Sequence, residues 1–179
     1  MKEKLNILVI LIAIFCMTLS AQGGVRKMTR EEKDQASIRK AVMTLKQLES
    51  FSAVPYCCRA GVYTIGYGFT DQNLVSKGVI SRTEADTILN FKCTELMTFL
   101  RSKITRELMT YQYAALISFT YNVGNNAFSN SELLKKINSG ASNLEIVQQI
   151  RRWDKVDGKV NKGLSNRRGA EVKLFMNVK

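Results

Sequence analysis

The sequence contains no histidine. Histidine is the usual base in Ser–His and Cys–His nucleophilic catalysis, so its absence excludes both mechanisms. Histidine is also a common ligand of catalytic zinc, and a catalytic zinc site is therefore not expected. Any acid–base chemistry near neutral pH must use Asp, Glu, Lys, Tyr or Cys side chains.

Acidic residues and proline are also scarce. The chain has 15 Asp and Glu against 27 Lys and Arg, a net charge of +12. Such a chain is attracted to polyanions, whether nucleic acid, anionic lipid or an acidic cell envelope, and charge alone does not choose among them. The single proline, Pro55, leaves helices elsewhere unbroken. With 179 residues, 45% of them apolar, the composition indicates one globular domain with its own core.

The longest apolar run is too short for an ordinary membrane span. It covers the eleven residues 7–17, after Lys2 and Lys4 and before small or polar residues. This order is typical of a secretory signal, whereas a span needs about 20 apolar residues. Extended to residues 5–21, the same segment would be a weak anchor, and a buried helix is a third interpretation. We expect residues 1–24 to be a signal peptide or weak signal-anchor that directs export to the periplasm or outside.

Periodicity in residues 25–179 predicts an α+β domain. Thr29 and Glu32 have the spacing of a capping box, and a helix is predicted from there to about Ser50. Its apolar stripe consists of Ile38, Val42, Leu45 and Leu48. Pro55 is expected to end this helix, residues 54–70 to form a hairpin and residues 71–78 a loop. Helices fill most of the remainder, so a small strand-bearing lobe precedes a larger helical lobe, and a cleft between them is the expected ligand site.

One short stretch combines an acid, a thiol and a hydroxyl. Glu49 ends the first predicted helix, and Cys58 and Thr64 lie on or near the two arms of the hairpin. The negative end of the helix dipole and partial burial would raise the pKa of Glu49, as a general acid requires. The thiol and the hydroxyl could orient a water, which suits hydrolysis of an acetal. The alternative is a surface Glu, a structural thiol and an ordinary strand threonine.

The spacing of these residues resembles that of a known family. Glu-x8-Cys-x5-Thr closing on "TIGYG" is similar to the Glu-x8-Asp-x5-Thr pattern of the phage-type lysozymes, or endolysins, of glycoside hydrolase family 24. Some members of that family carry Cys in place of Asp. Two further segments, "ALISFTYNVGNNAFSNSELLKKIN" and "RRWDKVDGKVNKGLSNRRGAEVKLF", resemble its central and C-terminal helices. The resemblance covers about residues 31–176 and implies a lysozyme-like fold.

The resemblance implies a muramidase that cuts the β-1,4 bond between N-acetylmuramic acid and N-acetylglucosamine in peptidoglycan. By position, Glu49 would be the proton donor, Cys58 would replace the water-orienting carboxylate, and Thr64 would hold the water. Family members invert the anomeric carbon. The matching positions for saccharide binding are Phe69, Thr70, Tyr121, Asn122 and Ser131. We expect a monomeric, exported, bacteriolytic enzyme that needs no metal or cofactor and binds peptidoglycan, with transient inner-membrane association and no nucleic acid.

Two departures from the family pattern put activity in question. A thiol with the ordinary pKa of about 8.5 is mostly neutral at pH 7, so Cys58 would orient water rather than deprotonate it unless Arg59 activates it. Phe69 also stands where family members usually have His. A catalytically impaired peptidoglycan-binding protein with the same fold is therefore the alternative function.

The four cysteines suggest a redox device. They are Cys16, Cys57, Cys58 and Cys93. If the N-terminus is retained, Cys58 could be blocked by a disulfide to Cys57 or Cys93, and Cys16 could exchange into that bond after release from the membrane. Cleavage of the N-terminus would remove Cys16 and this route.

Two further features have simple interpretations. Trp153 is expected in the core rather than as a sugar platform. Arg167 and Arg168 could contact acidic glycan or phosphate, or lie on a solvated helix face.

Overall fold

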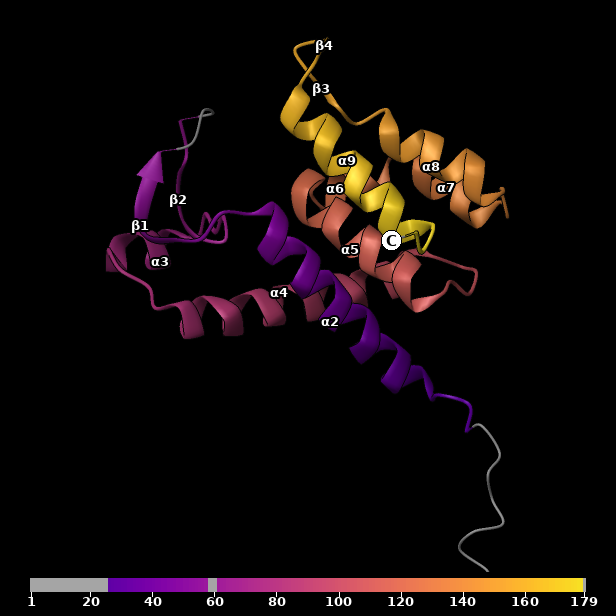
Figure 1. Cartoon of the computed structure of the whole chain (residues 1–179), viewed down its shortest axis with the longest axis horizontal. Coiled ribbons are helices and arrows are strands. Elements are labelled where there is room, and N and C mark those ends of the chain that lie inside the picture. Colours follow the sequence, from indigo (N-terminus) through magenta and orange to yellow (C-terminus); the bar gives the residue numbers. More distant parts are fainter. Residues whose placement is uncertain (1–25, 58–60, 179) are drawn as a thin grey trace, which may run out of the picture.

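The first helix begins at the predicted capping box. The computed structural model describes residues 26–57 and 61–178 (Figure 1). Helix α2 (Arg30–Leu48) has Thr29 as its N-cap, and the Thr29 hydroxyl and Glu32 carboxylate each accept the other residue's amide hydrogen. This confirms the predicted start. The expected signal at residues 1–24, with Cys16, and also Cys58 lie outside the described residues.

A two-stranded antiparallel hairpin follows α2. Strand β1 (Ser52–Cys57) pairs with β2 (Tyr63–Gly66), and Tyr56 lies opposite Thr64. The expectation that Pro55 ends the helix is wrong, because α2 ends at Leu48 and Pro55 lies inside β1. A two-stranded sheet consists of edge strands, which tolerate a residue that lacks an N–H donor.

The segment after the hairpin is helical, although a loop was expected. Helix α3 (Gln72–Lys77) begins where the Asp71 side chain accepts hydrogen bonds from the Asn73 and Leu74 amides. It ends at Gly78, whose φ of +79° is left-handed. Capping at both ends therefore stabilises a helix too short to show a periodic apolar stripe.

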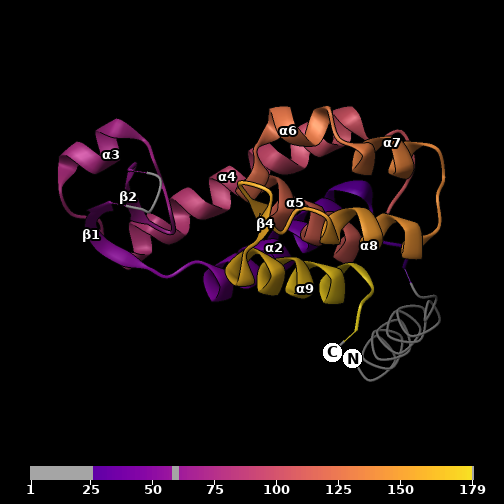
Figure 2. The ribbon, with the colours of Figure 1, turned by 90° about the horizontal axis from the view of Figure 1, so that it is seen from above.

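The helical lobe is built around one buried helix. Helix α4 (Arg82–Lys103) runs from the hairpin lobe into it (Figure 2). Helix α5 (Thr110–Val123) packs against α2, α4 and α9, and its residues 112–120 are all buried, as its apolar sequence predicts. Around it lie α6 (Asn125–Ser129), α7 (Glu132–Asn138), α8 (Asn143–Arg151) and α9 (Lys162–Phe175), with a minimal hairpin of β3 (Lys155–Val156) and β4 (Lys159–Val160) before α9. The predicted α+β arrangement is confirmed.

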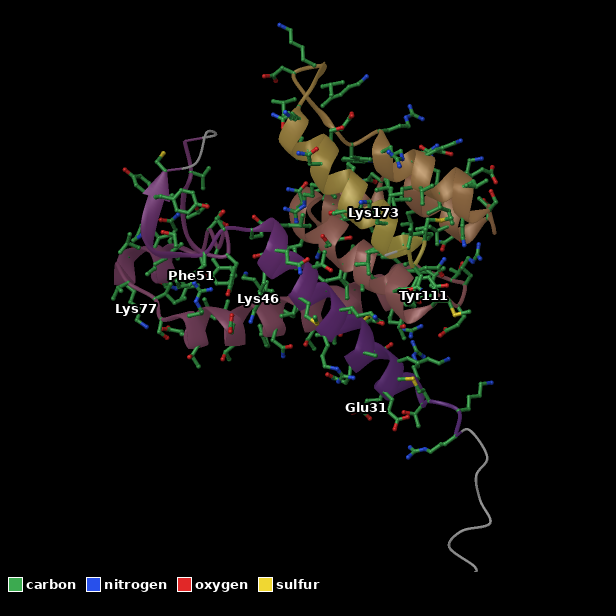
Figure 3. All side chains as sticks on the ribbon, in the orientation of Figure 1. Glu31, Lys46, Phe51, Lys77, Tyr111 and Lys173 are labelled. Atoms are coloured by element: carbon green, nitrogen blue, oxygen red, sulfur yellow. The ribbon has the colours of Figure 1, made fainter. Side chains whose placement is uncertain are left out.

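Polar contacts join the two lobes beside the end of α2. Lys46 pairs with Asp86 at 2.7 Å, and Asp86 also accepts a 2.8 Å hydrogen bond from the Tyr67 hydroxyl. The Tyr121 hydroxyl of α5 donates to the Tyr67 carbonyl at 2.7 Å. Figure 3 shows Lys46 close to this junction. Within residues 26–57 and 61–178, no helix has the length and apolar character to cross a bilayer.

Candidate active site

A cavity of about 780 Å³ lies where the two lobes meet. The end of α2, the loop after β2, and helices α4 and α5 contribute its walls. The lining residues are Glu49, Gly68, Phe69, Thr70, Lys92, Glu95, Leu96, Thr120, Tyr121, Asn122, Gly124 and Asn125. The structure thus brings together five of the residues predicted from sequence, namely Glu49, Phe69, Thr70, Tyr121 and Asn122.

The two oxygens of the Glu49 carboxyl group have different surroundings. Glu49 is the C-cap of α2, and its side chain is 23% exposed. Its Oε1 accepts a 2.5 Å hydrogen bond from Arg167 Nη1. Its Oε2 lies beside Gly68, close enough that a Cβ placed on Gly68 would be 3.7 Å away. One oxygen is therefore fixed by an arginine, and the other lies next to a cavity-lining glycine.

The arginines of α9 are buried, so the solvated helix face, one of the two alternatives for them, is wrong. Arg167 is 8% exposed and Arg168 is 1% exposed. Both pair with Glu171, which is fully buried, and Arg168 Nη2 also donates to Asn122 Oδ1 at 2.9 Å. Burial raises the pKa of Glu171, and the two guanidinium groups oppose this by stabilising its ionised form.

Two predicted site residues are absent from the described lining of the cavity. The Thr64 side chain is buried, and its hydroxyl donates to the Tyr56 carbonyl across the hairpin at 3.4 Å. Ser131 is the N-cap of α7, accepting from the Leu134 amide at 3.1 Å and donating to the Phe128 carbonyl at 2.6 Å. Ser131 therefore has a clear capping function in this fold.

Two aromatic residues are part of the cavity lining. Burial raises the pKa of the Tyr121 phenol, which stays neutral and donates to the Tyr67 carbonyl. Phe69 is 1% exposed, and the Lys92 ammonium lies 5.8 Å from the centre of its ring. Tyr121 is held by this hydrogen bond and Phe69 by its burial, so both rings are fixed parts of the lining.

Sequence reasoning did not anticipate Lys92 and Glu95 in the cavity lining, nor the contact of Arg167 with Glu49. Lys92 and Glu95 enter the cavity from α4, and Arg167 reaches Glu49 from α9. A signal for the burial of the α9 charges exists, because Arg168, Val172 and Phe175 follow one another at helical steps on one apolar face. A charged residue within such a stripe indicates a buried pair.

The two described cysteines differ in burial. Cys57 is exposed at the end of β1, whereas Cys93 is fully buried on α4. Burial raises the pKa of the Cys93 thiol to about 12. Trp153 packs against the core with its ring 5.6 Å from that of Phe119, as predicted, but it is only partly buried and also lines a second cavity.

Comparison with known proteins gives consistent matches. A family model described as phage lysozyme matches residues 46–171. The endolysin of Acyrthosiphon pisum secondary endosymbiont phage 1 is 37% identical over 144 residues, which are 76% of this chain and 94% of that protein. The SAR-endolysin of Enterobacteria phage P21 is 33% identical over 72% of this chain and 78% of its own length. The solved muramidase domain of SpmX from Asticaccaulis excentricus superposes with a TM-score of 0.68 at 26% identity, covering 84% of this chain and 98% of that domain.

Proposed function

As the chain belongs to the phage lysozyme family, we propose that it is an endolysin, a peptidoglycan hydrolase whose activity leads to bacterial lysis. The bond it cleaves is the β-1,4 linkage between N-acetylmuramic acid and N-acetylglucosamine, with inversion at the anomeric carbon. Its folded domain, residues 25–179, acts as a monomer and without a cofactor. The net charge of +12 supports an anionic cell envelope as its target.

Glu49 is the proposed proton donor. The observation that carries this role is the asymmetry of its carboxyl group, with Oε1 held by Arg167 and Oε2 beside Gly68 at the cavity. A general acid must present one defined oxygen to the leaving group, and a fixed carboxyl group meets this need. Thr70, Tyr121 and Asn122 line the same cavity and are proposed to contact the saccharide, with Phe69 beneath them.

The opposite face of the sugar needs a water molecule. In an inverting mechanism this water attacks the anomeric carbon directly, and no glycosyl-enzyme forms. We assign its orientation to Cys58 and Thr64. The Thr64 hydroxyl is buried outside the described cavity lining and makes a long hydrogen bond of 3.4 Å to the Tyr56 carbonyl, so its proposed role requires it to exchange that acceptor for a water.

Substitution of Glu49 tests the assignment. In Glu49→Gln an amide replaces the carboxyl group and cannot act as a general acid. We therefore expect the clearing of outer-membrane-permeabilised cells to slow by at least about 100-fold, the usual contribution of a general acid. The released fragments should end in reducing N-acetylmuramic acid, which mass spectrometry can establish.

The matched control is Glu31→Gln, which removes one charge from the exposed start of the same helix (Figure 3). This variant should clear cells like wild type. Equal clearing by wild type and Glu49→Gln would contradict the proposed role. Wall binding without clearing by wild type would favour the impaired, peptidoglycan-binding alternative.

The N-terminal segment and the cysteines are proposed to control export and activation. SAR-endolysins among the relatives support an N-terminal segment at residues 1–24 that first holds the enzyme at the inner membrane and then releases it. A disulfide from Cys58 to Cys57 or Cys93 would block the site until the Cys16 thiolate attacks it, forms a new disulfide and frees the Cys58 thiol. Because Cys93 is fully buried, pairing with Cys93 requires the core around α4 to open, and Cys57 is the more accessible partner.

A further inference from the structure

A fully buried carboxylate lies behind the cavity. Glu171 Oε1 accepts hydrogen bonds from the Ser118 hydroxyl at 3.0 Å, Arg167 Nε at 3.3 Å and Arg168 Nη2 at 3.1 Å. Its neighbours Val172 and Phe175 on α9 are apolar. Burying such a cluster costs desolvation free energy, and apolar residues of similar volume commonly stabilise a core at least as well. The cluster therefore calls for an explanation other than stability.

Each arginine of the cluster connects Glu171 to a residue of the cavity. Arg167 uses Nε for Glu171 and Nη1 for Glu49. Arg168 pairs with Glu171 and donates from Nη2 to Asn122. A single carboxylate on α9 thus supports two cavity side chains, one at the end of α2 and one on α5.

The Nε contact limits how Arg167 can meet Glu49. A guanidinium group readily pairs with a carboxylate through two parallel hydrogen bonds, which would occupy both Glu49 oxygens. In this structure Arg167 Nε donates to Glu171, and Arg167 Nη2 donates to the Ser118 carbonyl at 3.3 Å. Nη1 is therefore the nitrogen that donates to Glu49. Glu49 Oε2 consequently stays available beside Gly68.

The charge of Arg167 is shared in the same way. Its guanidinium pairs with Glu49 through Nη1 and with Glu171 through Nε, so it is divided between two carboxyl groups. Glu171 therefore fixes the guanidinium that orients Glu49.

We propose that Glu171 is a positioning residue, which holds Arg167 so that it binds one oxygen of Glu49 and leaves the other for proton donation. Its second arginine, Arg168, holds Asn122 at the cavity in the same way. This inference rests on the proposed function, because it assigns Glu171 a task in the same hydrolysis.

The main test is Glu171→Gln, which keeps the shape of the side chain and removes its charge. With purified peptidoglycan as substrate, and with rates corrected for the folded fraction, we expect kcat to fall about 10- to 100-fold, as for a displaced catalytic group. KM should rise only a few-fold, because Asn122, a proposed saccharide contact, is held less firmly by Arg168. Arg167→Lys should lose a similar factor, since one ammonium cannot span Glu171 and Glu49 as the guanidinium does. The double variant should be no slower than the slower single variant, because the residues act as one unit.

A matched control separates positioning from stability. Asp34→Asn breaks another partly buried pair, with Arg101, at the start of α2 and away from the lining of the cavity. It should lower the melting temperature and leave kcat unchanged. If Glu171→Gln fails to fold, Glu171→Asp keeps the charge with a shorter reach, and an intermediate kcat is expected. Wild-type kcat in a folded Glu171 variant would overturn the proposal.

A readout independent of catalysis distinguishes this inference from the proposed function. The Arg167 Nε–H should give a protected NMR resonance in wild type and lose this protection in Glu171→Gln. Unchanged protection would refute the positioning role even if the enzyme is active. Conversely, equal activity of wild type and Glu49→Gln would refute the proposed function, whatever the state of Arg167.

Discussion

At the scale of single residues, burial decides which ionisable groups are ready for chemistry. Glu49 is partly exposed at a cavity, whereas Glu171 and Cys93 are fully buried. The buried carboxylate has charged partners, which lower the cost of its burial. The Cys93 thiol is surrounded by core residues and stays neutral, so it makes a poor nucleophile for disulfide exchange in the folded state.

The buried thiol makes stability depend on pH in the alkaline range. Its pKa rises from an ordinary 9.0 to about 12 on folding. Between these values the unfolded chain loses the proton and the folded chain keeps it, so the free energy of unfolding falls as pH rises, by up to about 4 kcal/mol in total. Below pH 9 this contribution is fully present.

Urea denaturation of reduced protein at a series of pH values above 8 measures this effect. Cys93→Ala should show a shallower decline than wild type, by up to about 1.4 kcal/mol per pH unit. Comparing the two slopes removes the contributions of tyrosine and lysine residues common to both proteins. Parallel slopes would mean that the Cys93 thiol ionises normally in the folded state.

At the scale of secondary-structure elements, capping and glycine geometry set the hairpin lobe. Asp71 and Gly78 bound α3, and Gly66 ends β2 with a φ of +65°. A Cβ on Gly66 would lie 2.6 Å from Phe69 Cε2. The "TIGYG" stretch therefore needs glycine at residue 66 for both backbone conformation and packing against Phe69, a residue of the cavity lining.

Two glycine substitutions separate these requirements. Gly66→Ala combines a left-handed φ with a clash, and we expect a loss of about 2–5 kcal/mol in the free energy of unfolding. Gly78→Ala shares the left-handed φ but meets no atom within 4 Å, and should lose only about 1–2 kcal/mol. Chemical denaturation of the two variants and wild type provides the values. Equal losses would show that the Phe69 ring moves aside freely.

At the scale of the whole molecule, the cavity depends on segments far apart in the chain. Glu49 and Arg167 are 118 positions apart, and Tyr67 and Tyr121 are 54 apart. The two contacts join the hairpin lobe and the end of α2 to the helical lobe. The proposed exported enzyme must therefore complete its whole fold before the cavity is formed.

The fate of the N-terminal segment can be read from the intact mass of the exported protein. Export through a releasable anchor predicts the full-length mass. On reduction, this mass should increase by two hydrogen atoms for each disulfide. A mature chain beginning near Gln22 would instead show signal-peptide cleavage and would rule out exchange by Cys16. Cells expressing the enzyme with Cys16→Ser provide the control, and this variant should remain inactive if exchange is required.

The sequence by itself determined most of the helices and part of the cavity lining. Capping and periodicity rules were sufficient to predict the capping box at Thr29, the buried helix α5 and the order of the two lobes. The spacing from Glu49 to Thr64 and the two further segments were sufficient for the family. The position of Tyr121 and Asn122 in the cavity followed from that resemblance, since their spacing alone carries no such information.

Only the tertiary structure decided which charges meet. The apolar stripe of α9 indicates a buried charge but does not identify the partners of Arg167, because Glu49 and Ser118 come from the end of α2 and from α5. The physical reason is that hydrophobic periodicity fixes which face of each helix is buried, whereas the partner of a buried charge depends on how the helices pack against one another.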